Sequence, residues 1–180
     1  MSTRFNIAGT GHRPPVLFEG QKFIYDRKHQ EVLIKFAEIA LKAVLKKHNK
    51  EKAGIISGMA QGWDNALAHA AINLNLPLLA AVPFEGMESK WPEESKEDFK
   101  YLLSKAAKVH IVCEGGYEPK KFYLRDKYMV DNADLVLACH NGSTEGGTAI
   151  TVKYANEVQR PIENCWTQWE KYWNESLSSV

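Results

Sequence analysis

Short apolar segments alternate along this chain with longer segments of helical periodicity, and this alternation most constrains the fold. The apolar segments, expected as strands, cover residues 5–8, 53–56, 78–82, 108–112 and 135–139, with a last short strand near 161–162. The segments between them, of which the longest is expected at 21–47, repeat apolar residues at spacings of three and four, as amphipathic helices do. Strands that alternate with helices form right-handed βαβ units. We therefore predict an α/β fold, a parallel sheet with helices on both faces.

The chain has the length of one domain. Its 180 residues are enough for a sizeable core, and no repeat, linker or low-complexity segment divides them. We expect one domain over residues 1–164 and a helical tail over residues 165–180. The tail contains an aromatic stripe at helical spacing, which packs on its own domain or on a second subunit: Trp166, Trp169, Tyr172 and Trp173.

Each expected strand runs into a turn that contains glycine. The glycines of these turns are Gly9, Gly11, Gly58, Gly62, Gly86, Gly115, Gly116, Gly142, Gly146 and Gly147. In a parallel sheet these turns share the edge at which open α/β sheets bind ligands, and helix N-termini there present free N–H groups to a phosphate. A single turn can use glycine only to reverse the chain, but five at one edge favour an anion site. None reads G-x-G-x-x-G or G-x-x-x-x-G-K-[ST], so a standard dinucleotide site or P-loop is not expected.

Composition excludes several classes of protein. The formal charge of +1 is too balanced to indicate a nucleic-acid or membrane surface by itself, although it leaves room for a local basic patch. No apolar run has the length of a signal peptide or a membrane span. Cys113, Cys139 and Cys165 are odd in number and widely spaced, which argues against a disulfide framework and fits a reducing cytosol. The histidines lack metal-ligand spacing. We predict a cytoplasmic protein with no bound metal and no cofactor.

Five stretches of the chain resemble a known superfamily. In chain order they are "AGTGHRPP", "SGMAQGWDNALAHAA", "PFEGMESKWPEES", "RDKYMVDNADLVLA" and "GGTAITVKYA". Together, from about residue 7 to about residue 160, they resemble the YpsA-like branch of the SLOG superfamily, which includes the LOG ("Lonely guy") and DprA/Smf proteins. The resemblance implies a Rossmann-like sheet that binds a nucleotide or a nucleotide-derived ligand at its glycine-rich edge, and a homodimer or larger assembly.

The resemblance also assigns positions. Gly58, Gly62 and Asp64 match the turn after the second strand of the superfamily. Arg125 matches the arginine of the LOG R-x-x-x-M element. The last glycine turn of the superfamily, which binds a phosphate, is matched by Gly146, Gly147 and Thr148.

One departure concerns catalysis. LOG proteins hydrolyse nucleoside 5′-monophosphates with a glutamate that follows the Gly-Thr of the last turn. In this chain the residues after Thr148 are Ala149, Ile150, Thr151 and Val152, so no carboxylate stands there. The resemblance implies a retained phosphate site without the LOG catalytic acid.

The candidate site residues follow from these patterns. The predicted ligand-binding residues are Gly9, Thr10, Gly11, His12, Arg13, Ser57, Gly58, Gly62, Asp64, Trp91, Arg125, Gly146, Gly147 and Thr148. If catalysis survives, the candidates for it are Arg125, Asp64, Glu85, Glu88 and Glu145.

Each of these residues also has a purely structural interpretation. Arg125 points into a pocket or is a surface arginine on an apolar stripe. Asp64 holds a ribose hydroxyl or caps a helix. His12 and Arg13 donate to an anion or only shape a turn. Trp91 stacks on a base or covers the end of the sheet.

Three functions remain in competition. The first is a binding protein for a nucleotide or an NAD- or ADP-ribose-like molecule, acting as a sensor or by sequestration. The second is an N-glycosidase that acts on nucleoside 5′-monophosphates. The third, the least expected because of the balanced charge, is DprA-like binding of single-stranded DNA. The missing glutamate favours the first.

Overall fold

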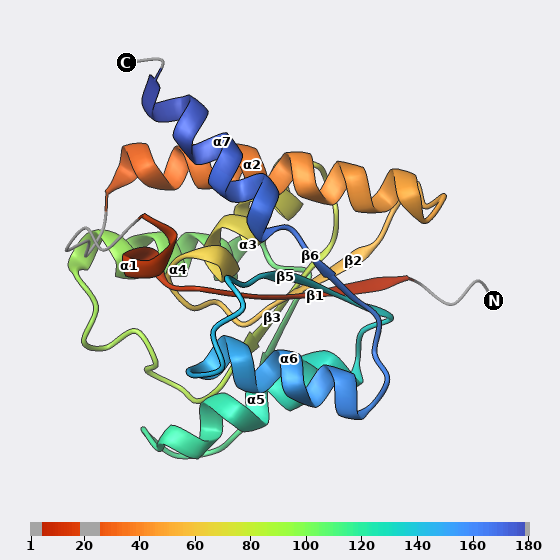
Figure 1. The fold of residues 1–180 in the computed structure, drawn as a ribbon. Helices are drawn as coiled ribbons and strands as arrows, with labels where there is room; N and C mark the ends of the chain where they lie inside the picture. The colour runs from red at the N-terminus through yellow and green to blue at the C-terminus, as the bar shows by residue number, and fades with distance from the viewer. Residues whose placement is uncertain (1–4, 19–25, 179–180) are drawn as a thin grey trace.

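The computed structural model describes residues 5–18 and 26–178 and confirms the predicted α/β fold (Figure 1). The elements in chain order are β1 (Asn6–Gly11), α1 (Pro14–Leu17), α2 (Arg27–Lys47), β2 (Gly54–Ser57), α3 (Trp63–Asn73), β3 (Leu78–Val82), α4 (Glu93–Lys105), β4 (Lys108–Ile111), α5 (Pro119–Asp131), β5 (Leu135–Cys139), α6 (Gly147–Glu157), β6 (Ile162–Asn164) and α7 (Trp166–Ser178). None of these helices is long and apolar enough to cross a membrane, as far as the described residues go.

All strands of the sheet are parallel, in the order β4-β3-β2-β1-β5-β6. The chain moves outward from β1 through β2, β3 and β4, and then returns to place β5 on the other side of β1. The turns after β1 and β5 therefore diverge, and a crevice opens between them at the carboxyl edge. Open α/β sheets bind ligands at such a switch point.

Helices cover both faces of the sheet, with unequal cores. Figure 1 shows α2, α3 and α7 on one face and α5 and α6 on the other. The larger cluster of buried side chains lies on the first face, where Leu41 of α2, Trp63 and Leu67 of α3 and Leu102 of α4 pack together. The second face is closed by smaller clusters around Met129 and around Val130.

The C-terminal helix α7 packs on its own chain. Trp169 and Trp173 are only 1% and 4% exposed and belong to the larger core cluster. The indole N–H of Trp169 donates to the main-chain oxygen of Leu17 at 3.1 Å, which ties α7 to α1. The aromatic stripe was expected to pack on its own domain or on a second subunit. These two tryptophans pack on their own domain.

Several element boundaries differ from the sequence prediction by one or more residues, and two of these differences have a clear physical cause. Helix α2 begins at Arg27, because Asp26 caps it by accepting from the N–H groups of Lys28 and His29; residues 21–25 of the expected helix lie outside the described residues. Strand β1 continues to Gly11, beyond the predicted end at residue 8, because residues 9–11 pair with β5. Trp63 packs where a Cβ on Gly11 would lie, so glycine there serves close packing.

Candidate functional site

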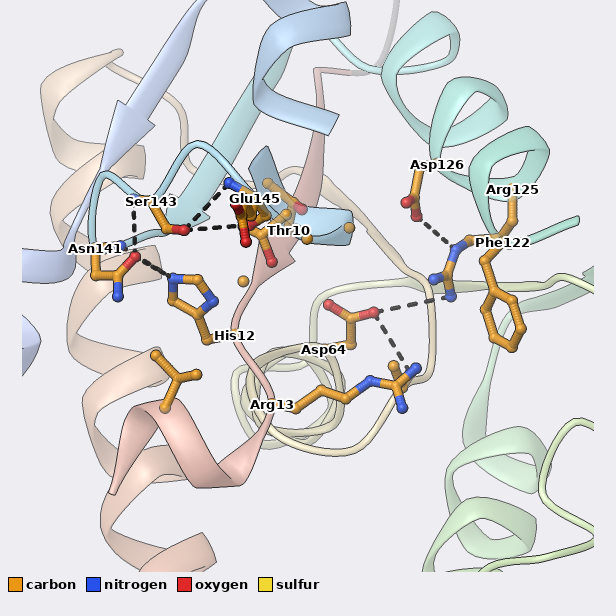
Figure 2. Close-up of a pocket in the computed structure, with 17 residues that line it drawn as sticks. Thr10, His12, Arg13, Asp64, Phe122, Arg125, Asp126, Asn141, Ser143 and Glu145 are labelled. Carbon is orange, nitrogen blue, oxygen red and sulfur yellow. Dashed lines mark hydrogen bonds and ion pairs between the residues drawn. The ribbon is translucent and has the colours of Figure 1, made fainter. Parts of the chain in front are cut away.

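A cavity of about 430 Å³ lies at the switch point, beyond the carboxyl ends of β1 and β5 (Figure 2). Most of the residues selected from the sequence line it: Gly9, Thr10, Gly11, His12, Arg13, Asp64, Arg125, Glu145, Gly146, Gly147 and Thr148. Its other lining residues are Val16, Ala60, Phe122, Asp126, Asn141 and Ser143. The turns after β1, β2 and β5 and the face of α5 thus converge on one hollow.

Arg125 reaches the cavity from α5 and is only 5% exposed. Its guanidinium donates to the main-chain oxygen of Gly58 and, at 2.7 Å, to Oδ1 of Asp126. Oδ2 of Asp64 lies 3.9 Å from Nη1. A Cβ on residue 58 would lie 2.7 Å from that same Asp64 oxygen and would overlap the guanidinium, so glycine there leaves room for both side chains. The arginine is therefore a fixed cation in the wall of the cavity.

Asp64, in the first turn of α3, is a desolvated carboxyl group. Burial raises its pKa to about 6, although Arg125 nearby lowers it, and the residue is 8% exposed. The N–H of Ala60 donates to Oδ2 at 3.4 Å. A carboxyl group with a pKa near neutrality in a cavity is suited to bind hydroxyl groups or to transfer a proton.

His12, which follows β1, is held as a neutral imidazole. The N–H of Asn141 donates to Nε2 at 3.1 Å, and the Asn141 side-chain oxygen lies 2.8 Å from the same nitrogen. Burial lowers the pKa of His12, since the bond to Asn141 only partly opposes it. These two contacts hold the Nε2 edge of the ring against Asn141, and Figure 2 shows Nδ1 on the cavity side of the ring. Nδ1 of His12 is thus placed to form a hydrogen bond with a ligand.

The N-terminus of α6 points its main-chain N–H groups at the cavity. Gly146 is the N-cap residue, with φ of 91°, and no side chain caps the helix. Among the described residues, no hydrogen bond uses the N–H groups of Gly147 and Thr148. The preceding loop is shaped by its own bonds, in which the Ser143 N–H donates to Asn141 and the Glu145 N–H to Ser143. Such a terminus carries partial positive charge and binds anions.

Some predicted residues lie outside the lining. Ser57 and Gly62 help to position Asp64. The Ser57 hydroxyl donates to the main-chain oxygen of Asp64 at 2.8 Å, and Gly62 precedes α3 with φ of 95°. Trp91 lines a neighbouring cavity. Glu85 and Glu88 line neither cavity.

Sequence reasoning missed Asp126, Asn141 and Ser143. Asp126 follows Arg125 in the sequence and belongs to no motif that would single it out. Its place in the cavity depends on the packing of α6 on α5, where the Thr151 hydroxyl lies 3.0 Å from its second carboxylate oxygen. Asn141 lies in the glycine-rich stretch after β5. A polar residue two positions after a buried strand at the ligand edge was the available signal.

The charge pattern of the cavity is mixed, with Arg13 and Arg125 opposed by three carboxylates, those of Asp64, Asp126 and Glu145. Cations suit a phosphate, and carboxylates suit sugar hydroxyls. In the part of the chain that the structure describes, no three His, Cys, Asp or Glu side chains are grouped so that they could hold a metal ion.

The raised pKa of Asp64 predicts a pH-dependent stability. Because the folded protein binds this proton more tightly than the unfolded chain, whose pKa is 3.8, stability falls as pH rises from about 4 to about 6. Asparagine does not ionise, so the stability of Asp64→Asn does not fall in this way. Between pH 4 and pH 7 the difference in free energy of unfolding between the variant and wild type is therefore expected to change by ~2–3 kcal/mol in favour of the variant. Urea unfolding at a series of pH values measures it, with Glu157→Gln on exposed α6 as the control. Parallel curves for Asp64→Asn and wild type would contradict the prediction.

Fold and site together define a class: a Rossmann-like α/β protein whose glycine-rich turns enclose a polar cavity at the switch point of a parallel sheet. The family model described as the YspA SLOG family (YpsA) matches residues 8–169. The chain therefore belongs to the YpsA family of SLOG proteins, as the five sequence stretches predict.

Curated relatives are similar over part of their length. A UPF0398 protein of Bacillus cereus (strain B4264) is 29% identical over 91 residues, which cover 50% of this chain and 49% of that protein. A UPF0398 protein of Bacillus thuringiensis (strain Al Hakam) matches with the same identity and coverage. The chain thus spans about half the length of the curated relatives that it matches.

Two solved structures have the same fold. DNA processing protein A (DprA) of Streptococcus pneumoniae superposes with a TM-score of 0.58 at 19% identity, over 89% of this chain and 50% of that one. DNA processing protein A of Helicobacter pylori gives 0.57 at 18% identity, over 90% and 65%. At these identities the likeness shows the fold alone.

Proposed function

We propose that this protein binds a nucleotide or a nucleotide-derived molecule of the NAD or ADP-ribose kind in the switch-point cavity. The observation that carries the proposal is the uncapped N-terminus of α6, which faces the same hollow as the buried guanidinium of Arg125. Main-chain N–H groups and a fixed arginine are the usual partners of a phosphate. Thr148 adds a hydroxyl group at the same helix end.

The remaining polar groups favour a sugar phosphate over a bare phosphate. Asp64 and Asp126 would repel an anion placed against them, but their carboxylates accept hydrogen bonds from ribose hydroxyls. The neutral His12 offers a ring nitrogen for hydrogen bonding without adding charge. A ligand that carries an anionic end and a hydroxyl-rich end fits this division of the cavity.

The biological role that we propose is sensing or sequestration of this ligand in the cytoplasm, by a homodimer or a larger assembly. The chain carries the phosphate-binding turn without the glutamate that LOG proteins use. Binding without turnover is the simplest use of such a site.

Hydrolysis of a nucleoside 5′-monophosphate to base and ribose phosphate is the second candidate. One observation favours it: Asp126 and Asp64 lie on either side of Arg125, so the cavity contains carboxylates even though the LOG glutamate is missing. An N-glycosidic bond breaks through an oxocarbenium-like state that a nearby carboxylate stabilises. The pKa of Asp64, about 6, suits a general acid or base near neutral pH.

Binding of single-stranded DNA is the weaker alternative. DNA processing protein A of Helicobacter pylori has a single-stranded DNA binding mode. In the present chain the cavity combines two arginines with carboxylates, whereas a DNA groove requires continuous positive charge and stacking aromatics. A gel-shift titration at rising salt separates this alternative, since DNA binding weakens steeply with salt.

A thermal-shift screen tests the proposal directly. We expect one class among nucleoside monophosphates, NAD, ADP-ribose and cyclic dinucleotides to raise the unfolding temperature by about 5 °C or more at 100 times its Kd. Inorganic phosphate at equal ionic strength is the control for general anion effects. No shift with any class would refute the binding proposal.

Chromatography of the incubated ligand then separates binder from enzyme. An intact ligand after long incubation supports a binding protein. A free base that forms with wild type and not with Asp126→Asn supports the hydrolase. This variant removes one carboxylate charge but keeps the size of the side chain and a hydrogen-bond acceptor for Arg125.

A further inference from the structure

A second cavity, of about 290 Å³, adjoins the first along the same edge of the sheet. Its walls come from the turns after β3 and β4 and from the first turns of α5. Arg13, Ala60 and Phe122 line both cavities, so they form the boundary between the two. The second cavity is therefore a continuation of the proposed phosphate site.

Four aromatic rings dominate this second cavity. Phe84, Tyr117 and Phe122 form a connected group, with centroids 5.9 Å apart for Phe84 and Tyr117 and 5.5 Å apart for Phe84 and Phe122. Trp91 lines the same cavity and is held by an edge contact to Phe99. Phe84 is buried, whereas Tyr117 is 70% exposed, so its ring is accessible to a ligand.

The exposed Tyr117 sits on an anchored loop. Lys121, a buried lysine of α5, donates from its amine to the main-chain oxygens of Glu114 and Gly116, both at 2.7 Å. The same amine lies 5.9 Å from the centre of the Phe84 ring. A buried ammonium group is costly unless it is fully hydrogen-bonded, so these bonds hold the loop in place. The aromatic wall is preorganised.

We propose that this aromatic cavity binds the nucleobase of a ligand whose phosphate lies at the N-terminus of α6. The inference rests on the proposed function, because the first cavity supplies the phosphate site. Arg13, at the boundary, is placed to contact a second phosphate between the two ends. This arrangement fits a base joined to a ribose phosphate through a pyrophosphate, as in ADP-ribose, better than a nucleoside monophosphate.

The flat ring of a base gains affinity by stacking on Trp91 or Tyr117, and Lys90 at the same cavity can donate to its polar edge. Loss of one stacked ring costs about 10-fold or more in affinity. The sugar-phosphate end makes no contact with these rings, so its affinity is independent of them. The two cavities therefore contribute separable parts of the binding.

Isothermal titration with two probes, ADP-ribose and ribose 5-phosphate, tests the inference. Ribose 5-phosphate carries the sugar and phosphate without a base. Wild type is expected to bind ADP-ribose at least 10-fold more tightly than ribose 5-phosphate. Tyr117→Ala and Trp91→Ala should each weaken ADP-ribose about 10-fold and leave ribose 5-phosphate unchanged, whereas Tyr117→Phe, which keeps the ring, should bind like wild type. Tyr123→Ala, an exposed tyrosine of α5 outside both cavities, is the matched control.

The outcomes distinguish the two proposals. Equal affinity of wild type for both probes, or an unchanged ADP-ribose affinity in both alanine variants, overturns the base site and leaves the phosphate site standing. Failure of wild type to bind either probe refutes both proposals for this ligand class. Because Tyr117 is mostly exposed, Tyr117→Ala is expected to unfold at the wild-type temperature, so a loss of binding cannot arise from unfolding.

Discussion

Gly147→Asp is expected to lower the affinity for the nucleotide ligand by more than about 100-fold while the protein stays at least as stable as wild type. Gly147 is the first residue of α6, at the end that lines the cavity. A Cβ at this position meets no atom within 4 Å, so the side chain fits without a clash. Its carboxylate would occupy the anion site and repel a phosphate, and such like-charge contacts cost several kcal/mol.

The stability of this variant shows whether a loss of affinity comes from a changed binding site or from unfolding of the protein. An acidic side chain in the first turn of a helix stabilises it by ~0.3–1 kcal/mol through the helix dipole. Gly147→Asn, of equal size and without charge, is the matched control and should lose far less affinity. Titration calorimetry and thermal unfolding of both variants provide the measurements. Equal losses of affinity for Asp and Asn would show that bulk and not charge matters, and the phosphate would then lie elsewhere.

Trp169→Ala is expected to lower the free energy of unfolding by ~3–5 kcal/mol, the cost of removing a fully buried large aromatic side chain. Trp169 packs against Phe18 and Phe36, at 5.8 Å and 5.4 Å between ring centres, and bonds to Leu17 through its indole N–H. The variant therefore leaves a cavity and an unpaired main-chain oxygen inside the larger core.

Leu177→Ala on the same helix is the control, because Leu177 is 47% exposed and its loss should cost under ~0.5 kcal/mol. Urea unfolding measures both variants. The comparison also tests the division of the chain into residues 1–164 and a tail. A loss under ~1 kcal/mol for Trp169→Ala would mean that the tail is a separate appendage, whereas the expected loss makes it part of the core.

The sequence predicted the positions of the strands well, because most are short, nearly continuous apolar runs. The inner strands β1, β2, β3 and β5 are buried on both faces, whereas the edge strands β4 and β6 are partly exposed. Strand β5 begins and ends at the predicted residues. The predicted strand ends were wrong where a tertiary contact determines the end of the strand. Strand β1 extends through Gly9 and Gly11 because β5 offers hydrogen bonds beside it and because Leu67 and Trp63 need the space that a Cβ would fill.

The candidate site was predictable where it depends on strand ends. His12, Arg13 and Gly147 follow strands, and parallel strands bring their ends to one edge. Asp126 and Asn141 were not predictable in the same way, since each acquires its role from a partner distant in the chain. Asp126 meets Thr151 across two helices, and Asn141 meets His12 across two strands.

By itself, then, the sequence determined the α/β class, the family and the edge at which the glycine turns gather. These depend on local patterns: apolar runs, helical spacing and glycine. Only the tertiary structure decided that β5 lies beside β1, which opens the cavity, and that Asp64 is buried deeply enough to raise its pKa to about 6. Desolvation and charge pairing depend on distances between residues far apart in the chain, and local patterns carry no information about those distances.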